Sequence, residues 1–337
     1  MSGRVDFDPV AEAEQPFGAA ALPDQRVERG EQCLTANPAG ALRIAVNERR
    51  DAVIDFIDAA RAELSLSLFR CDDDSVLDAV GRAVERGVRV RALVTERARG
   101  SKAHLKELRR RIKKLGADVR RYADPVVRYH AKYAIADDRL AIVASLNFTR
   151  KCFRDTCDFM LVSRDTALAG ELRRLFDADW FGRTYLPKGA AGERLMVAPE
   201  NARPRFVECL RQATRSIRLI DPKLQDPAML MLLRSREAEG VTIDVRGEEG
   251  LGTLVPHGKL LMVDDELAVI GSIALSTLAL EFRRELAVAI RDRRCLDDVN
   301  DFWGSLPAKP VPPKPRSGDG GRSQEASASF SNQEPAS

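Results

Sequence analysis

The stretch from His130 to Asn147, HAKYAIADDRLAIVASLN, returns 127 positions later as HGKLLMVDDELAVIGSIA, from His257 to Ala274. In both copies a histidine is followed by a lysine two residues on and by an aspartate five further on, and an apolar run then ends at a serine. The shared positions are His130, Lys132, Asp137 and Ser145 in the first copy and His257, Lys259, Asp264 and Ser272 in the second. Because the two copies hold two of the three histidines of the chain, they indicate a duplicated unit and not a chance match.

The repeat extends beyond the motif in both directions. The downstream matches at the same spacing are Thr149 with Ser276 and Asp158 with Glu285. Upstream, residues 86–88 match residues 239–241 at a spacing of 153, so the second copy is shorter by 26 residues (153 − 127) before its histidine. A unit of about 120 residues that occurs twice predicts two pseudo-symmetric halves.

Strand-like and helix-like segments alternate around the motifs. Residues 64–69 (LSLSLF) alternate as a strand, a helical pattern follows from Ser75 to Gly87, and residues 88–94 (VRVRALV) form the next strand. This order favours an α/β layered fold with parallel strands. We expect a first half at 39–188 and a second half at 189–306.

Composition limits the class of protein. The chain of 337 residues has a net charge of only +3, and its six cysteines form no CxxC pair, so we expect neither a disulfide framework nor a zinc site. Residues 1–38 predict a weakly ordered leader without a signal peptide, and the Pro-, Ser- and Gly-rich residues 307–337 predict a disordered tail. With no apolar run of 18 residues, the expected location is cytoplasmic, with any action on lipid peripheral to the membrane.

The residue types of the motif suit phosphate chemistry. On a strand, residues two apart share a face, so each histidine and its lysine point the same way. A neutral imidazole can act as nucleophile or base, and a lysine beside it can bind a phosphate oxygen. Asp137 and Asp264 are expected to orient a histidine, while Ser145, Asn147 and Ser272 could hold anionic oxygens.

The pattern HxKx4D, followed by six residues and G-S-x-N, resembles the HKD signature of the phospholipase D superfamily, in particular its two-motif bacterial members that are similar to cardiolipin synthase. The resemblance covers about residues 42–306. It implies a phospholipase D-like α/β sandwich with mixed sheets, outer helices and both motifs in one site that needs no metal or cofactor. It also implies that one histidine attacks phosphorus to form a phosphohistidine while the other protonates the leaving alcohol.

Carried over to this chain, the resemblance implies a role for each motif residue. His130 and His257 are nucleophile and general acid, with His130 favoured as the nucleophile. Lys132 and Lys259 bind phosphate, Asp137 and Asp264 orient the histidines, and a supporting set comprises Ser145, Asn147, Ser272, Asp158 and Glu285. Two positions depart from the signature: Ala144 replaces its glycine in the first motif, and Ala274 replaces its asparagine in the second.

The substrate stays open between alternatives. The resemblance favours a phospholipid headgroup at a membrane surface, which the enzyme would cleave or exchange. The basic helix expected at 101–116 is equally compatible with nucleic acid and hence with a metal-independent nuclease, because residues 97–121 carry eleven Lys or Arg against two acidic residues. A non-catalytic phosphate-binding module is the third alternative, motivated by Ala274. The run 72–74 (DDD) is expected to begin a helix, as Asp226 does in the second half.

Overall fold

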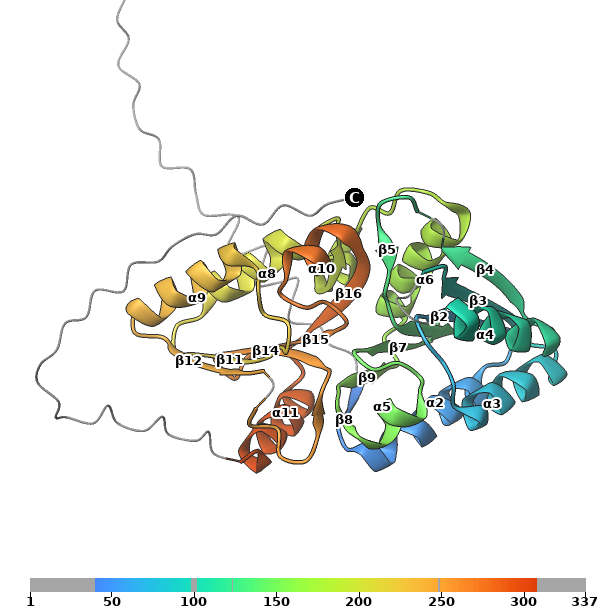
Figure 1. Ribbon diagram of the computed structural model, residues 1–337, viewed down its shortest axis with the longest axis horizontal. Helices are drawn as coiled ribbons and strands as arrows, with labels where there is room; N and C mark the ends of the chain where they lie inside the picture. The colour runs from blue at the N-terminus through green and yellow to red at the C-terminus, as the bar shows by residue number, and fades with distance from the viewer. Residues whose placement is uncertain (1–39, 98–101, 123, 248, 308–337) are drawn as a thin grey trace, which may run out of the picture.

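The computed structural model describes residues 40–97, 102–122, 124–247 and 249–307 (Figure 1). The leader expected at 1–38 and nearly all of the tail expected at 307–337 lie outside these residues. The described chain forms two halves that lie side by side in Figure 1, each with one mixed sheet.

The first half forms a sheet of seven strands in the order β1-β9-β7-β6-β2-β3-β4. Its strands are β1 (Gly40–Arg43), β2 (Glu63–Leu68), β3 (Arg89–Thr95), β4 (Asp118–Tyr122), β6 (Tyr133–Ala136), β7 (Leu140–Ala144) and β9 (Met160–Ser163). The pairs β2–β3 and β3–β4 are parallel, and the other four pairs are antiparallel.

The second half repeats this plan in the order β10-β16-β15-β14-β11-β12. Its strands are β10 (Leu195–Ala198), β11 (Ser216–Ile220), β12 (Thr242–Arg246), β14 (Lys259–Val263), β15 (Leu267–Gly271) and β16 (Arg283–Ile290). Only β11 and β12 run parallel among these strands. The expected α/β sandwich of two pseudo-symmetric halves with mixed sheets is therefore confirmed.

The expectation of parallel strands was wrong for most pairs, and the motif itself explains why. Each motif contains a β-hairpin whose three-residue connection begins with two aspartates at positive φ, 53° and 51° at Asp137 and Asp138 and 54° and 61° at Asp264 and Asp265. Such a turn matches the twist of two antiparallel strands, and aspartate tolerates positive φ better than most residues. The Asp-Asp pair thus turns the chain back beside the strand that begins at Lys259 or directly after Lys132.

Most helices cover the outer faces of the two sheets. The helices are α2 (Val46–Ala59), α3 (Asp74–Glu85), α4 (Lys102–Lys114), α5 (Arg150–Arg154), α6 (Thr166–Phe181), α7 (Gly189–Arg194), α8 (Ala202–Gln212), α9 (Pro227–Ala238), α10 (Thr277–Phe282) and α11 (Arg293–Ser305). α2 to α5 pack on the first sheet and α8 to α10 on the second. The expected helix starts are confirmed, because Asp73 and Asp226 cap α3 and α9 with their carboxylates.

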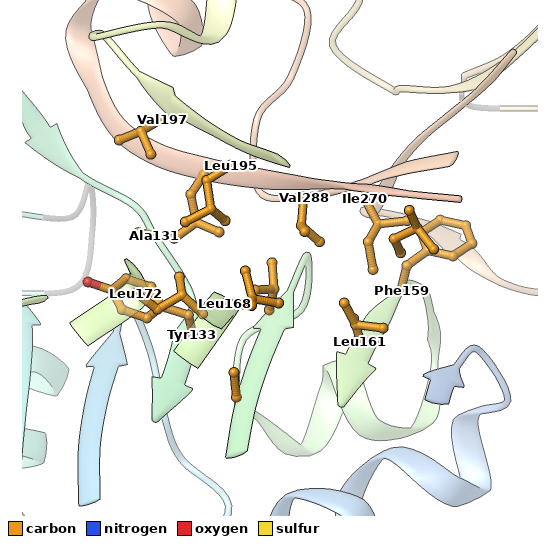
Figure 2. Close-up of a cluster of buried hydrophobic side chains, with 14 of the residues drawn as sticks. Ala131, Tyr133, Phe159, Leu161, Leu168, Leu172, Leu195, Val197, Ile270 and Val288 are labelled. Carbon is orange, nitrogen blue, oxygen red and sulfur yellow. The ribbon is translucent and has the colours of Figure 1, made fainter. Parts of the chain in front are cut away.

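The largest apolar cluster lies between the two halves (Figure 2). Tyr133 and Leu161 from the first sheet face Val197 and Val288 from the second, and α6 and α11 contribute to the same cluster. Neighbouring residues of β6, β7 and β9 point to the opposite face and pack under the outer helices. Because both faces are buried, the central strands are continuous apolar runs, and apolar packing holds the two motifs in a fixed relation.

Short strands also cross between the halves. β5 (Arg128–Tyr129) of the first half pairs in parallel with the start of β16, and β8 (Thr156–Cys157) pairs in parallel with β13 (Val255–Pro256) of the second. The two crossings are related by the spacing of 127, since β5 corresponds to β13 and β8 to the start of β16. Each crossing strand directly precedes a motif histidine or a buried carboxylate, so the crossings bring residues of opposite halves together.

In the part of the chain that the structure describes, no helix is both long and apolar enough to cross a membrane.

Candidate active site

Each motif histidine is paired with a carboxylate of the opposite half. Nδ1 of His257 lies 2.8 and 3.0 Å from the two carboxylate oxygens of Asp158. Nδ1 of His130 lies 2.9 Å from Oε1 of Glu285, in a close contact that lacks the alignment of a hydrogen bond. Both carboxylates are fully buried. The pairing leaves Nε2 of each ring as the nitrogen that is available for chemistry.

The Asp158 carboxylate has additional partners. Ser145 donates its hydroxyl to Oδ1 at 2.6 Å, and Thr156 donates to Oδ2 at 2.5 Å. Burial opposes ionisation of Asp158, but His257 and these hydroxyls outweigh it and lower its pKa. Asp158 is therefore a fixed, ionised partner for the ring of His257.

Glu285 has different neighbours from those of Asp158. Its pKa is also lowered, because His130 and the two motif lysines outweigh the effect of burial. Ser272, the counterpart of Ser145, accepts a hydrogen bond from the backbone N–H of Leu286 at 3.2 Å, and Arg283 approaches Oε1 of Glu285 at 3.4 Å. Both serines thus accept a hydrogen bond from an equivalent backbone N–H group, that of Phe159 or Leu286, but of the two only Ser145 also contacts a carboxylate.

The motif aspartates do not orient the histidines, so that expectation was wrong. Asp137 accepts hydrogen bonds from three consecutive backbone N–H groups, at residues 61–63, each at 2.8 Å. Asp264 accepts from the N–H groups of residues 214–216 at 2.7 to 2.8 Å. The physical reason is distance, because the seven residues from His130 to Asp137 span about 23 Å of extended chain.

The motif lysines lie beneath the histidines. Nζ of Lys132 donates to the backbone oxygen of His130 at 2.5 Å, and Nζ of Lys259 does the same to His257. Both side chains are buried, at 2% and 8% exposure. The pKa of Lys132 falls to about 7, chiefly because of burial and also because of the charge of Lys259, although Glu285 acts in the opposite direction.

The pKa of His130 falls to about 3, first because of burial and then because of repulsion by Lys132, although Glu285 acts in the opposite direction. Its ring packs edge-on against Phe69, with the centroids 4.4 Å apart. His130 is therefore a neutral imidazole near pH 7, held between an aromatic ring and a carboxylate.

Both histidines open onto one pocket of about 440 Å³, which is lined by His130, Pro222, Lys223, Pro256, His257 and Lys259. A larger pocket of about 630 Å³ shares Pro256 and His257 and extends across the first half toward α4. His257 therefore lies where the two pockets adjoin, and both carry basic side chains suited to an anion.

The remaining predicted residues have distinct places. Asn147 lines the larger pocket, and its side-chain oxygen is buried without a hydrogen-bond partner among the described residues. Ala274, its counterpart, is buried and has no polar side chain. His104, on the exposed face of α4, also lines the larger pocket.

Sequence reasoning missed two basic residues. Arg70 and Lys223 line the larger and the smaller pocket, respectively. Each lies three residues before a capping aspartate, Asp73 or Asp226, so the repeat at a spacing of 153 was the signal that could have found them.

Comparison with known proteins finds a family and two relatives whose names refer to cardiolipin. The family described as "Cardiolipin synthase, PLD-like domain" matches residues 53–180. Human mitochondrial cardiolipin hydrolase is 33% identical over 126 residues, which is 36% of this chain and 47% of that protein. Cardiolipin synthase A of Pseudomonas aeruginosa is 30% identical over 180 residues, which is 51% of this chain and 33% of the synthase. The chain thus covers less than half of the curated relatives it matches.

Two solved structures share the fold across most of the chain. Phosphatidylserine synthase of Haemophilus influenzae superposes with a TM-score of 0.63 at 12% identity, covering 83% of this chain and 90% of the synthase. Polyphosphate kinase of Porphyromonas gingivalis superposes with a TM-score of 0.65 at 18% identity, covering 86% of this chain and 50% of the kinase. In its duplicated motif, its fold and these relatives, the chain is similar to the phospholipase D superfamily, and the PLD-like domain model itself matches residues 53–180.

Proposed function

We propose that the chain is a phosphodiesterase of the phospholipase D type, which cleaves or exchanges a phospholipid headgroup through a phosphohistidine intermediate. One observation carries the proposal. Two imidazoles from opposite halves open onto the same pocket, each with a buried carboxylate at Nδ1 and a lysine beneath it. Two nitrogen bases on one phosphate allow one to attack phosphorus while the other serves the leaving oxygen.

His130 suits the role of nucleophile because it is neutral at pH 7. Its Nε2 attacks phosphorus, the bond from phosphorus to the leaving alcohol breaks, and His257 donates its Nε2 proton to the departing oxygen. In the second step water or an acceptor alcohol gives a proton back to His257 and attacks phosphorus, which breaks the N–P bond. The buried Asp158 carboxylate would stabilise the imidazolium form that His257 needs as an acid.

The charges around the pocket suit a phosphodiester. Lys259 and Lys223 line it, and Lys132 lies buried beneath His130. Fixed cations can stabilise charge that develops on the phosphoryl oxygens in the transition state, and a low-dielectric site strengthens that effect. The aspartates at the turns contribute by holding the hairpins that begin directly after Lys132 and at Lys259.

A phospholipid is the substrate that three of the four relatives described above favour, since the names of the hydrolase and both synthases refer to phospholipids, whereas the fourth is a polyphosphate kinase. α4 adds a basic surface beside the larger pocket, where Lys102 and Lys106 are exposed. Such a surface could hold the protein at an anionic membrane while the headgroup enters the site.

A substrate panel tests the proposal. Purified protein is given phosphatidylglycerol, cardiolipin and phosphatidylcholine vesicles, with and without a primary alcohol, and also single- and double-stranded DNA, all in EDTA. We expect a free headgroup or a new phosphatidyl alcohol from at least one lipid, and an acid-labile phosphohistidine on the protein. Nicking of DNA without lipid turnover would replace the lipid by nucleic acid as the substrate. Absence of both turnover and adduct would leave a phosphate-binding module.

A further inference from the structure

The two histidine–carboxylate pairs differ at one buried neighbour. α5 and α10 are counterparts, and each begins with a hydroxyl cap, Thr149 or Ser276. Within them Cys152 corresponds to Ala279 at the spacing of 127, and both are buried. The first half therefore places a thiol beside the pair of Asp158 and His257, and the second half places a methyl group at the matching position.

Three potential metal ligands meet at this point. The sulfur of Cys152, a carboxylate oxygen of Asp158 and a ring nitrogen of His257 all lie within 4.8 Å of one another. They come from three segments, α5, the residue after β8 and the second motif, so the spacing of cysteines along the chain gave no indication of them. Among the described residues this is the one group of three such side chains close enough to hold an ion.

We propose that Cys152, Asp158 and His257 form an inhibitory site for a thiophilic divalent cation such as Zn²⁺. Thiolate, carboxylate and imidazole are the ligand types that zinc prefers, at about 2.0 to 2.3 Å each, and three protein ligands leave a fourth position for water. The gap of 2.8 Å between Nδ1 and Asp158 has to widen by only a few tenths of an ångström to admit the ion, because two ligands of tetrahedral zinc lie about 3.2 Å apart.

The site is reachable from solvent. Cys152, Thr156 and His257 all line the pocket of about 630 Å³, and the side chain of His257 is 28% exposed. Cys152 and His257 thus both border the space through which an ion would enter. On binding, the Cys152 thiol and Nδ1 of His257 each release a proton to solvent, and Asp158 exchanges its hydrogen bond with the ring for a bond to the ion.

Binding would stop turnover, and this consequence rests on the proposed function. A metal on Nδ1 keeps the remaining ring proton on Nε2, so the ring cannot accept a proton there. A metal-bound neutral imidazole is also a weaker acid than imidazolium, so it cannot protonate the leaving alcohol. The ion would therefore block both steps assigned to His257 without touching His130.

Zinc binding by the full chain tests the site without needing a substrate. Wild-type protein, freed of metal by EDTA and dialysed, is titrated with ZnCl₂ in a calorimeter and separately with CoCl₂ while the near-ultraviolet thiolate-to-cobalt absorption is followed. We expect one site that is at least about tenfold weaker in Cys152→Ala, together with loss of the cobalt band. The alanine occurs naturally at the matching position 279, so the fold should accept it, and Cys209→Ala in α8 is the matched control for loss of another buried thiol.

Two results would overturn the proposal. Equal zinc affinity and an unchanged cobalt band in wild type and Cys152→Ala would remove the site. Binding that requires Cys152 but leaves lipid turnover unaffected at saturating Zn²⁺ would remove its inhibitory role. If no substrate is turned over, the calorimetric and spectroscopic comparison still decides whether the zinc site exists. A failure of the zinc site can therefore be told apart from a failure of the proposed function.

Discussion

The two halves place a histidine, a lysine and a buried carboxylate in matching positions but surround them differently. His257 faces an aspartate fixed by two hydroxyls, beside a thiol and at the edge of the larger pocket. His130 faces a glutamate near an arginine and packs against an aromatic ring. The shared geometry comes from the repeat, and the different neighbours are what would assign unequal chemical roles to two equivalent histidines.

The largest expected effect is on turnover, and it should differ between variants of the two histidines. His130→Ala should lower turnover by about 10⁴-fold or more because no covalent intermediate can form, and His257→Ala by about 10²- to 10⁴-fold. With an aryl phosphodiester, whose leaving group needs no proton, His257→Ala should release one equivalent of phenol in a burst and then stall. His130→Ala should release none. Rapid-quench or stopped-flow measurement of the burst checks this, and a burst in His130→Ala alone would exchange the two roles.

The next largest effects on kcat should come from Asp158 and Glu285, the carboxylates that pair with a histidine of the opposite half. Asp158→Asn is expected to reduce kcat by about 10²- to 10⁴-fold, because an amide can offer Nδ1 a donor and stabilise the wrong tautomer. Glu285→Gln should reduce kcat less than Asp158→Asn. The reason is that Asp158 also accepts hydrogen bonds from two hydroxyls, which an amide at position 158 would disturb. Steady-state kinetics on one lipid substrate gives the comparison. Asp155→Asn, three residues away and partly exposed, is the control and should leave kcat unchanged.

The lysine beneath His130 should make anion binding depend on pH. Since the pKa of Lys132 is about 7 in the free protein, its ammonium loses the proton as the pH rises above 7, while a bound dianion favours the protonated form. Affinity for sulfate, whose own charge is constant here, should therefore fall by up to about tenfold per pH unit between pH 8 and 9. His130, with a pKa of about 3, does not titrate in this window. Calorimetry on wild type and Lys132→Arg checks this, and equal slopes in the two proteins would contradict it.

The turn aspartates should affect stability and not chemistry. Asp137→Asn keeps a residue that tolerates positive φ but weakens three hydrogen bonds to backbone N–H groups, so the free energy of unfolding should fall by about 1 to 3 kcal/mol. Urea unfolding measures this, with kcat of the folded protein expected to stay close to wild type. Asp138→Asn, at the exposed next position of the same turn, should cost less. A large loss of kcat in a stable Asp137→Asn protein would restore a catalytic role for this residue.

α4, which has no counterpart in the second half, should affect membrane binding and not the chemistry of the site. Replacing Lys102 and Lys106 by alanine should weaken binding to anionic vesicles by about fivefold for each charge removed, with less effect at high salt. Sedimentation with phosphatidylglycerol vesicles gives the measurement. Lys188→Ala, an exposed lysine away from α4, should bind like wild type. Equal losses in Lys188→Ala would mean that net charge matters and not the helix.

Much of the fold could be read from local patterns. The strands of each motif, the Asp-Asp turn between them and the helix starts at Asp73 and Asp226 depend on neighbours within a few residues, and these follow from periodicity and turn chemistry. The repeat also placed Asp158 and Glu285 at matching positions beside the motifs. The parallel arrangement was mispredicted because strand–helix alternation says little about a hairpin formed within the motif.

By itself the sequence determined that this protein consists of two copies of one α/β unit, each with a histidine two residues before a lysine, because those features depend on residues close together in the chain. The expected shared strand face was wrong, since both histidines lie just before the first strand of their hairpin and not on it. Only the tertiary structure decided which carboxylate meets which histidine. That pairing depends on two-residue strands that cross between the halves, too short to have a pattern of their own. The same crossing brings Cys152 to His257 across 105 positions (257 − 152), a contact that no local spacing encodes.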